Sequence, residues 1–227
     1  MAPAPEKTGD LKRDLLGRAH GIKSLDVKGR LHVTDRGRKL PSFNARIWFY
    51  RQDESLFLRI RGSGPLGVTV FDLLACGNEA WIYLPSKNRI LKGNTFFTSY
   101  GNIGVETAIK LMEICLNPWV PARYCRFPAT MEQTGSAGSL IRLKCRFLGQ
   151  NLVLRYRLDS LMPVSFESSL ADITFTSTRP ESLNRYPERI SFHLKKEGIQ
   201  GTLAVNEVKF NTLSPESPVF NRAIFAR

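Results

Sequence analysis

The sequence predicts a mainly β protein of the α+β class, in which one antiparallel sheet is accompanied by two helices. Short apolar runs with two-residue alternation recur along most of the chain, as in half-buried strands. Short Gly, Pro and Asn turns separate these runs, which favours an antiparallel meander over an alternating parallel α/β sheet. Only two segments carry the three-to-four spacing of an amphipathic helix.

The first helix is predicted from Asp10 to Ile22, with Gly21 available as its C-terminal stop. The period then changes to two, and strands are expected at residues 25–33 and 43–50 on either side of a polar turn. Residues 1–9 form a Pro/Ala-rich segment that we interpret as a flexible tether before one domain, residues 10–227.

Residues 54–88 contain three more alternating runs, and these predict three successive strands. The turn after the first of them, Gly62 to Gly67, has three glycines and one proline and can bend sharply. It places a large apolar residue, Leu66, at its tip. A leucine here either folds back against the sheet or protrudes, and the sequence leaves both open.

The same periodicities predict the remaining strands and the second helix. A short strand at Arg89 to Leu91 and the aromatic pair Phe96-Phe97 precede the second helix, Ile103 to Leu116, which Asn117-Pro118 ends. A strand is expected at 139–148, and the strand that pairs with it carries Arg155 and Arg157. The other expected strands are 165–167, 172–177, 189–195 and 200–211, making about ten in all.

A basic ribbon is predicted on the hairpin that follows the second helix. From Arg123 to Arg157 there are seven basic residues and one acid, Glu132. We expect the ribbon to bind anionic headgroups, although a charged run of this kind is often only a solvated face. Its members are Arg142, Lys144, Arg146, Arg155 and Arg157.

Charge is the compositional outlier. The chain has 227 residues and a formal net charge of +13, beside ordinary hydrophobic (42%) and charged (23%) fractions. Such an excess attracts nucleic acid, anionic lipid or lipopolysaccharide, and composition does not choose among them. Aromatic and basic residues alternate at Arg46 to Arg51, but no nucleic-acid motif accompanies them, so we expect no nucleic-acid partner.

No catalytic or metal-binding pattern stands out. The three histidines lie in separate segments without metal-ligand spacing, and no nucleophile elbow or phosphate-binding loop occurs. We therefore predict no enzyme activity, no metal and no cofactor. The four cysteines lack C-x-x-C spacing and suit buried thiols or disulfides equally well. If a disulfide forms, Cys115 and Cys125 are the favoured pair.

Several short motifs resemble one family. A strand ends in Gly64-Pro65-Leu66-Gly67, two more strands follow, and the second helix is followed by Asn-Pro-Trp-Val-Pro. Near the C-terminus, Tyr-Pro-Glu-Arg-Ile at 186–190 leads to Val-Lys-Phe-Asn at 208–211. This pattern resembles the LolA/LolB group of bacterial lipoprotein carriers and receptors, and locally it is most similar to the receptor LolB.

The resemblance implies a strongly curved antiparallel sheet, an open half-barrel whose concave apolar face is covered by the two helices. In that group the hollow accepts acyl chains of lipoproteins, and apolar hollows bind apolar ligands. We therefore expect a non-catalytic lipid- or lipoprotein-binding protein. The predicted lining residues, about half of which we expect to be core alone, are Phe43, Ile47, Phe49, Leu56, Leu58, Ile60, Ile109, Met112, Leu143 and Phe147.

The resemblance also implies a membrane-touching role for Leu66, a periplasmic location, and an outer-membrane lipid anchor attached to a cysteine that would precede Ala2. Its expected partners are acyl chains, an anionic membrane surface and other envelope proteins. The main alternative is an interaction or sensor protein of the same fold, with a filled interior and a basic partner-binding face. A nucleic-acid-binding module is the remaining alternative.

Overall fold

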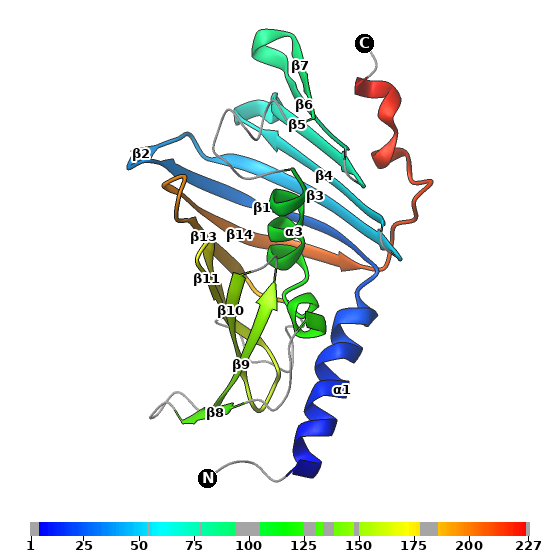
Figure 1. Cartoon of the computed structure of the whole chain (residues 1–227). Helices are drawn as coiled ribbons and strands as arrows, with labels where there is room; N and C mark the ends of the chain where they lie inside the picture. Colours follow the sequence, from blue (N-terminus) through cyan, green and yellow to red (C-terminus); the bar gives the residue numbers. More distant parts are fainter. Residues whose placement is uncertain are drawn as a thin grey trace. The chain divides into compact units, whose positions relative to one another are not determined.

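A computed structural model describes residues 5–53, 55–77, 79–93, 105–124, 130–133, 139–147, 150–177 and 186–225. Its strands are antiparallel and follow the order β7-β6-β5-β4-β3-β1-β14-β13-β12-β11-β10-β9-β8, with β2 paired to β1. The order does not close on itself, and two α-helices accompany the sheet (Figure 1). The predicted fold class, a mainly β open half-barrel with helices, is confirmed.

The chain divides into two compact units. The β1–β7 unit comprises residues 22–112 and 203–227, and the β8–β13 unit comprises residues 1–21 and 113–202. The first of these contains β1 (Ser24–Asp35), β2 (Arg38–Lys39), β3 (Phe43–Gln52), β4 (Ser55–Ser63), β5 (Thr69–Cys76), β6 (Glu79–Leu84), β7 (Arg89–Lys92) and most of β14 (Ile199–Phe210).

Strand register gives the β1–β7 unit two distinct faces. Phe49 of β3 pairs with Leu25 of β1 and Leu58 of β4, and Leu58 pairs with Ala75 of β5. Side chains of paired residues point to the same side of a sheet, so these residues share one side, which we call the apolar face. Trp48 lies on the opposite side, which we call the aromatic face.

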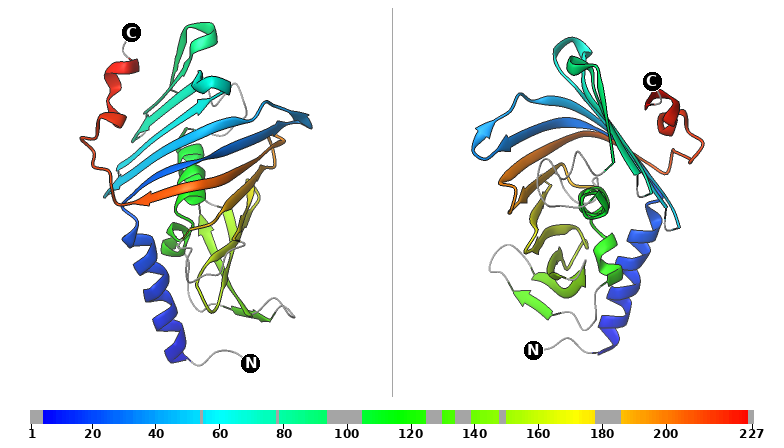
Figure 2. Two further views of the ribbon diagram at one scale, coloured as in Figure 1. Left: turned by 180° about the vertical axis from the view of Figure 1, so that it is seen from behind. Right: turned by 45° about the horizontal axis from the view of Figure 1, so that its top comes forward.

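The C-terminal segment covers the aromatic face. The C-terminal segment, red in Figure 2, runs beside these strands and contains two short 3-10 helices, η5 (Pro218–Phe220) and η6 (Arg222–Phe225). Phe220 and Phe225 form one buried cluster with Trp48 and Trp81. The Phe57 and Phe220 rings lie 5.8 Å apart at their centroids. Burial of these aromatics makes the segment part of the core, because each large ring removes a great deal of apolar area from water.

The β8–β13 unit contains α1 (Pro5–Gly21), β8 (Thr130–Gln133), β9 (Ser139–Phe147), β10 (Gln150–Arg157), β11 (Pro163–Ser168), β12 (Ala171–Thr176) and β13 (Arg189–Leu194). The second helix, α3 (Val105–Leu116), crosses the division between the units and leads into η3 (Val120–Tyr124). No helix of the described segments is long and apolar enough to cross a membrane.

The residues after α3 fasten α1 inside the β8–β13 unit. The side-chain amide of Asn117 donates to the carbonyl of Ala19, 3.1 Å away, near the end of α1. Trp119 is buried, and its ring nitrogen donates to the carbonyl of Leu161 at 2.8 Å. The guanidinium of Arg18 lies 5.9 Å from the centre of the Trp119 ring. The Asn-Pro-Trp motif therefore holds α1 through polar contacts as well as packing.

The structure changes several predicted boundaries. Helix α1 begins at Pro5, so the last part of the predicted tether is helical, because proline fits the first turn of a helix. The short strands β2 and β8 were not predicted, because two to four residues show too little alternation to indicate a strand. The predicted elements at Phe96-Phe97 lie outside the described residues.

Candidate functional site

Six of the predicted lining residues come together on the apolar face. Ile47 of β3 pairs with Ile60 of β4, and Phe49 pairs with Leu58. The other two, Phe43 and Leu56, lie two or four residues along the same strands and so share that side. Their grouping follows from strand register, while their binding of a ligand stays a prediction.

Exposure along the apolar face rises toward one end. Phe49 and Leu58 have no accessible surface, and Ile47 is buried, whereas Ile60 and Phe43 are partly exposed. Phe43 begins β3, so the accessible end is the one where β3 starts and β4 finishes. The buried members act as core, and a ligand approaching this face would meet Phe43 and Ile60 first.

Phe71 completes the accessible end, although the sequence analysis did not select it. It pairs with Gly62 of β4, and its ring lies over that glycine: a Cβ added at Gly62 would be 2.2 Å from Phe71 Cε1. The ring reaches Phe43 on β3, with an edge-to-face contact of 5.8 Å between centroids. A glycine inside a strand often marks such close approach, and this was the available signal.

The remaining predicted lining residues lie elsewhere. Ile109 on α3 is buried and Met112 is partly exposed. Leu143 of β9 is fully buried in the β8–β13 unit, and Phe147 is the last residue of the same strand. A common pocket formed by residues of both units stays a prediction.

Leu66 protrudes from the β4–β5 connection. It is the middle residue of the 3-10 turn η1 (Pro65–Gly67), and its side chain is fully exposed, at 101% of its reference area. Its backbone is left-handed, with φ 61° and ψ 18°, which costs a non-glycine residue about 1–3 kcal/mol. Val68 beside it is 64% exposed. The alternative in which Leu66 folds back as a plug is therefore wrong.

The backbone around Leu66 is held by its own hydrogen bonds. The Gly64 nitrogen donates to the Val68 oxygen at 2.8 Å, and Gly67 takes φ 74°, a conformation that favours glycine. These contacts fix the turn without using the leucine side chain. The side chain is therefore free to contact something outside the protein.

The predicted basic ribbon lies on one side of the β9–β10 pair. Arg155 pairs directly with Arg142, and Arg157 lies two residues further along β10. Lys144 and Arg146 are exposed on β9. Like charges opposite each other on neighbouring strands repel, so this arrangement favours a nearby anion.

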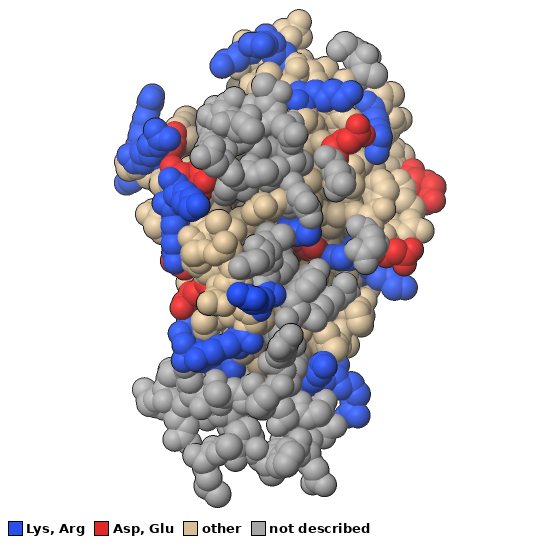
Figure 3. Space-filling model, viewed as in Figure 1, with Lys and Arg blue, Asp and Glu red and all other residues tan. Residues whose placement is uncertain are grey.

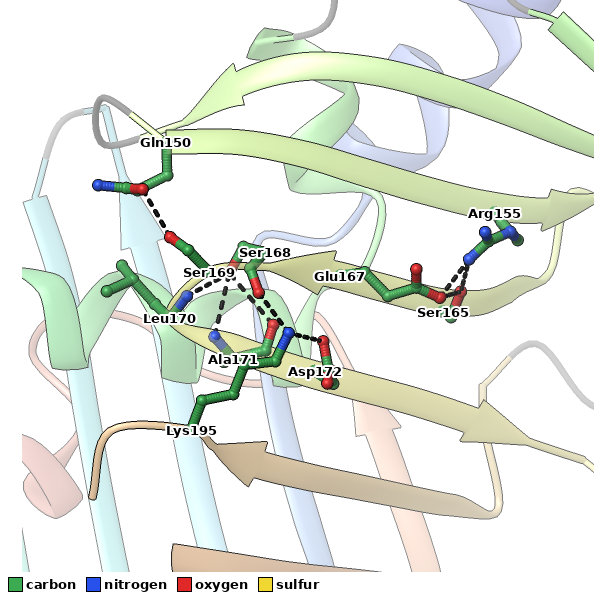
Figure 4. Close-up of polar contacts among 10 residues, drawn as sticks. All are labelled: Gln150, Arg155, Ser165, Glu167, Ser168, Ser169, Leu170, Ala171, Asp172 and Lys195. Carbon is green, nitrogen blue, oxygen red and sulfur yellow. Dashed lines mark hydrogen bonds and ion pairs between the residues drawn. The ribbon is translucent and has the colours of Figure 1, made fainter. Parts of the chain in front are cut away.

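One anion comes from the protein itself. Figure 4 shows Arg155 turned toward Ser165 and Glu167 of β11, and it forms an ion pair with Glu167. Further along, Lys195 is paired with Asp172 at 2.8 Å. Arg155 therefore has an internal partner, and headgroup binding by the ribbon stays a prediction.

The bonding state of the cysteines differs from the predicted disulfide. Cys115 is a free thiol, as is the buried Cys76, whereas Cys145 is disulfide-bonded. The favoured disulfide between Cys115 and Cys125 is therefore wrong; Cys125 itself lies outside the described residues. Burial raises the pKa of the Cys115 thiol to about 12. Two prolines after α3 suggested a return of the chain toward Cys115, but the chain enters η3 instead, where Val120 and Ala122 are buried.

Comparison with known proteins gives the fold. Neither a protein-family model nor a curated protein matches the sequence. An outer membrane lipoprotein-sorting protein domain from Vibrio parahaemolyticus is similar in structure, with a TM-score of 0.66, 16% identity, and coverage of 98% of this chain and 99% of that one.

Two further solved structures are similar to this chain over most of its length. A DUF1329 family protein from Desulfovibrio piger gives a TM-score of 0.67 at 12% identity, covering 96% of this chain and 98% of its own. A LolA superfamily protein from Nitrosomonas europaea gives 0.55 at 12% identity, covering 94% and 98%. The chain therefore has the LolA/LolB-like fold.

Proposed function

We propose that this protein is a non-catalytic carrier or receptor that holds acyl chains of lipids or lipoproteins and meets a membrane through the Leu66 turn. The observation that carries the proposal is the fully exposed Leu66 on a strained left-handed backbone. Exposure of a large apolar residue and backbone strain both cost free energy, and together they point to a functional contact.

The apolar face supports the acyl-chain part of the proposal. Its accessible end carries Phe43, Ile60 and Phe71, and this is also the end from which the β4–β5 turn projects, since Asn44 pairs with Ser63 just before that turn. An acyl chain leaving a bilayer at Leu66 would therefore reach the open end of the apolar face over a short path. Aromatic and aliphatic side chains at such a position suit a chain without polar groups.

A location in the bacterial envelope fits the chemistry of the cysteines. Cys145 is disulfide-bonded, and disulfides persist in oxidising compartments such as the periplasm. The similar proteins include an outer membrane lipoprotein-sorting domain, which adds to the same proposal. We place the protein in the periplasm, associated with the outer membrane, where lipid anchors and other envelope proteins are available partners.

A second candidate function has an observation of its own. Phe49, Leu58 and Leu143 have no accessible surface, as expected for a filled interior. This favours the interaction or sensor protein, in which the fold has no hollow and the basic face holds a protein partner. The two functions differ in whether an acyl chain enters.

Uptake of a fluorescent fatty acid separates them. We expect saturable binding by the wild type and its loss in Phe43→Glu, because a carboxylate at the accessible end would oppose an apolar chain. The matched control is Asn44→Glu, the next residue of β3, which is exposed on the aromatic face. No saturable uptake by the wild type would favour the filled-interior alternative. Equal uptake by both variants would remove the Phe43 end of the apolar face from the binding site.

A further inference from the structure

We propose that the end of the β1–β7 unit that carries Leu66 is a docking surface for an anionic membrane. Cations of two neighbouring turns bind the anionic headgroups. The inference rests on the proposed function, since it names the lipid class that the Leu66 turn meets. It assigns the headgroup contact to residues that the sequence analysis did not select. They are Arg36, Arg38, Lys39, Lys87 and Arg89.

Strand register brings the three turns to one end. Asn44, next to the start of β3, pairs with Ser63 at the end of β4, so the Leu66 turn projects where β3 begins. The β1–β2 turn lies at the same end, because Leu31 pairs with Phe43 shortly before the chain turns. All of these strands belong to the β1–β7 unit.

The β6–β7 connection reaches the same end from the other side. Tyr83 of β6 pairs with Asp72 of β5, close to the start of that strand, and the turn η2 (Pro85–Lys87) follows directly. Arg89 then opens β7 opposite Leu84. Lys87 and Arg89 therefore flank the Leu66 turn on the side opposite to the β1–β2 turn.

These turns carry an excess of exposed positive charge. Residues 35–40, 64–70 and 85–89 together contain five cations and one acid, Asp35. All five cationic side chains are exposed, and in the described part of the chain none of them forms an ion pair or a side-chain hydrogen bond. Figure 3 shows Lys and Arg gathered over the β1–β2 hairpin and over the β6–β7 hairpin. The charge is thus directed outward.

Apolar and cationic groups at one end have a common physical partner. Leu66 and Val68 are exposed in the middle connection, and Leu40 beside the β1–β2 turn is 39% exposed. A bilayer interface accepts apolar side chains into its acyl region while its anionic headgroups attract the surrounding cations. A nucleic-acid partner would satisfy the charge but would leave the exposed side chains of Leu66 and Val68 without an apolar contact, whereas a bilayer interface accepts both.

Vesicle binding tests the assignment with charge-matched variants. The test variants are Arg36→Gln/Arg38→Gln and Lys87→Gln/Arg89→Gln. The control is Lys23→Gln/Lys209→Gln, which removes two exposed cations at the opposite end of the β1–β7 unit, where Asn211 N donates to Ser24 O. Lys209 forms an exposed ion pair with Glu207, and such pairs contribute little to stability. Each protein is mixed with vesicles of phosphatidylcholine alone and of phosphatidylcholine with phosphatidylglycerol, and its partitioning is measured by flotation.

Each basic residue near an anionic surface contributes about fivefold to binding, so each test variant should bind the anionic vesicles about 25-fold more weakly than the wild type. The control should bind as the wild type does, and neutral vesicles should bind all of them weakly. High salt of about 1 M should abolish the difference, because it shortens the screening length to about 3 Å. Melting temperatures of all variants should agree, because every substituted side chain is exposed.

Three results would overturn the assignment. Test variants that bind anionic vesicles as the wild type does would remove these turns from the contact. A loss confined to Lys144→Gln/Arg146→Gln would place the headgroup contact on the β9–β10 ribbon instead. Equal binding of the wild type to neutral and anionic vesicles would remove the headgroup charge from recognition.

Fatty-acid uptake by the same proteins separates this inference from the proposed function. Uptake without a preference for anionic vesicles would leave the carrier function standing and overturn the docking surface. A preference for anionic vesicles that weakens in the two test variants, without any uptake, would support the docking surface while the carrier function fails.

Discussion

Arg59 and Asp72 form a bidentate ion pair that is almost completely buried on the aromatic face of the β1–β7 unit. Arg59 Nε lies 2.8 Å from Asp72 Oδ1, Arg59 Nη2 lies 2.6 Å from Oδ2, and their side chains are 3% and 4% exposed. Arg61 also donates to Asp72, and Arg59 Nη1 donates to the carbonyl of Val219. The pair therefore fastens the C-terminal segment to the strands.

Removing the charge of Asp72 should destabilise the protein strongly. Breaking a buried pair from one side leaves the partner's charge without compensation, which costs about 3–5 kcal/mol. We expect Asp72→Asn to lower the free energy of unfolding in urea by this amount. Glu79→Gln is the control: Glu79 and Arg222 are 54% and 55% exposed, and such pairs contribute about 0–1 kcal/mol. Equal effects of the two substitutions would contradict the structure.

The free thiols should resist alkylation while the protein is folded. Burial raises the pKa of Cys115 to about 12, and it also raises the pKa of Cys76, an effect that the nearby Arg222 partly offsets. Only the thiolate reacts, so at pH 8 both groups stay protonated and unreactive. Mass spectrometry after iodoacetamide treatment should show labelling of both thiols in denaturant and of neither without it. Rapid labelling of the folded protein would show that the cysteines are accessible.

Two buried tyrosines should make the protein sensitive to high pH. The hydroxyl of Tyr186 donates to the carbonyl of Leu116, and that of Tyr156 donates to the carbonyl of Pro118, both at 2.9 Å. Burial raises the pKa of both tyrosines above the ordinary value. Above pH about 10 the unfolded chain loses these protons while the folded protein keeps them. The contribution of these two tyrosines to the free energy of unfolding is therefore fully present below pH about 10, and it is lost as the pH rises further.

Tyr186→Phe tests this directly. At neutral pH it should cost about 1–3 kcal/mol, because the carbonyl of Leu116 loses its buried partner. Its stability should then fall less steeply than that of the wild type as the pH rises above about 10. Urea unfolding measured at several pH values gives both quantities. Parallel curves for the two proteins would mean that Tyr186 ionises equally in the folded and unfolded states.

Much of the fold was predictable because it rests on local patterns. Alternation in residues 43–50 identifies a strand and also identifies which side chains share its apolar face, since the period of a strand is two. The protrusion of Leu66 was one of two open alternatives. Its direction depends on a left-handed backbone that neither composition nor periodicity encodes.

Non-local contacts set the limit of the sequence analysis. The ring of Phe71 crosses Gly62 to reach Phe43, and the C-terminal Phe220 covers Trp48, although these residues are far apart in sequence. The docking surface was missed for the same reason. Arg36 and Lys87 belong to separate turns, and only the strand register shows that both lie at one end of the sheet.

The charge substitution Leu66→Glu tests the account most directly, with Leu158→Glu as control at another exposed leucine, in the β10–β11 turn of the β8–β13 unit. Because Leu66 is fully exposed, we expect the free energy of unfolding to stay within about 0.5 kcal/mol of the wild type. Binding to vesicles containing phosphatidylglycerol should be lost in Leu66→Glu and kept in Leu158→Glu. A stable Leu66→Glu protein that binds these vesicles as the wild type does would contradict a membrane contact through this turn.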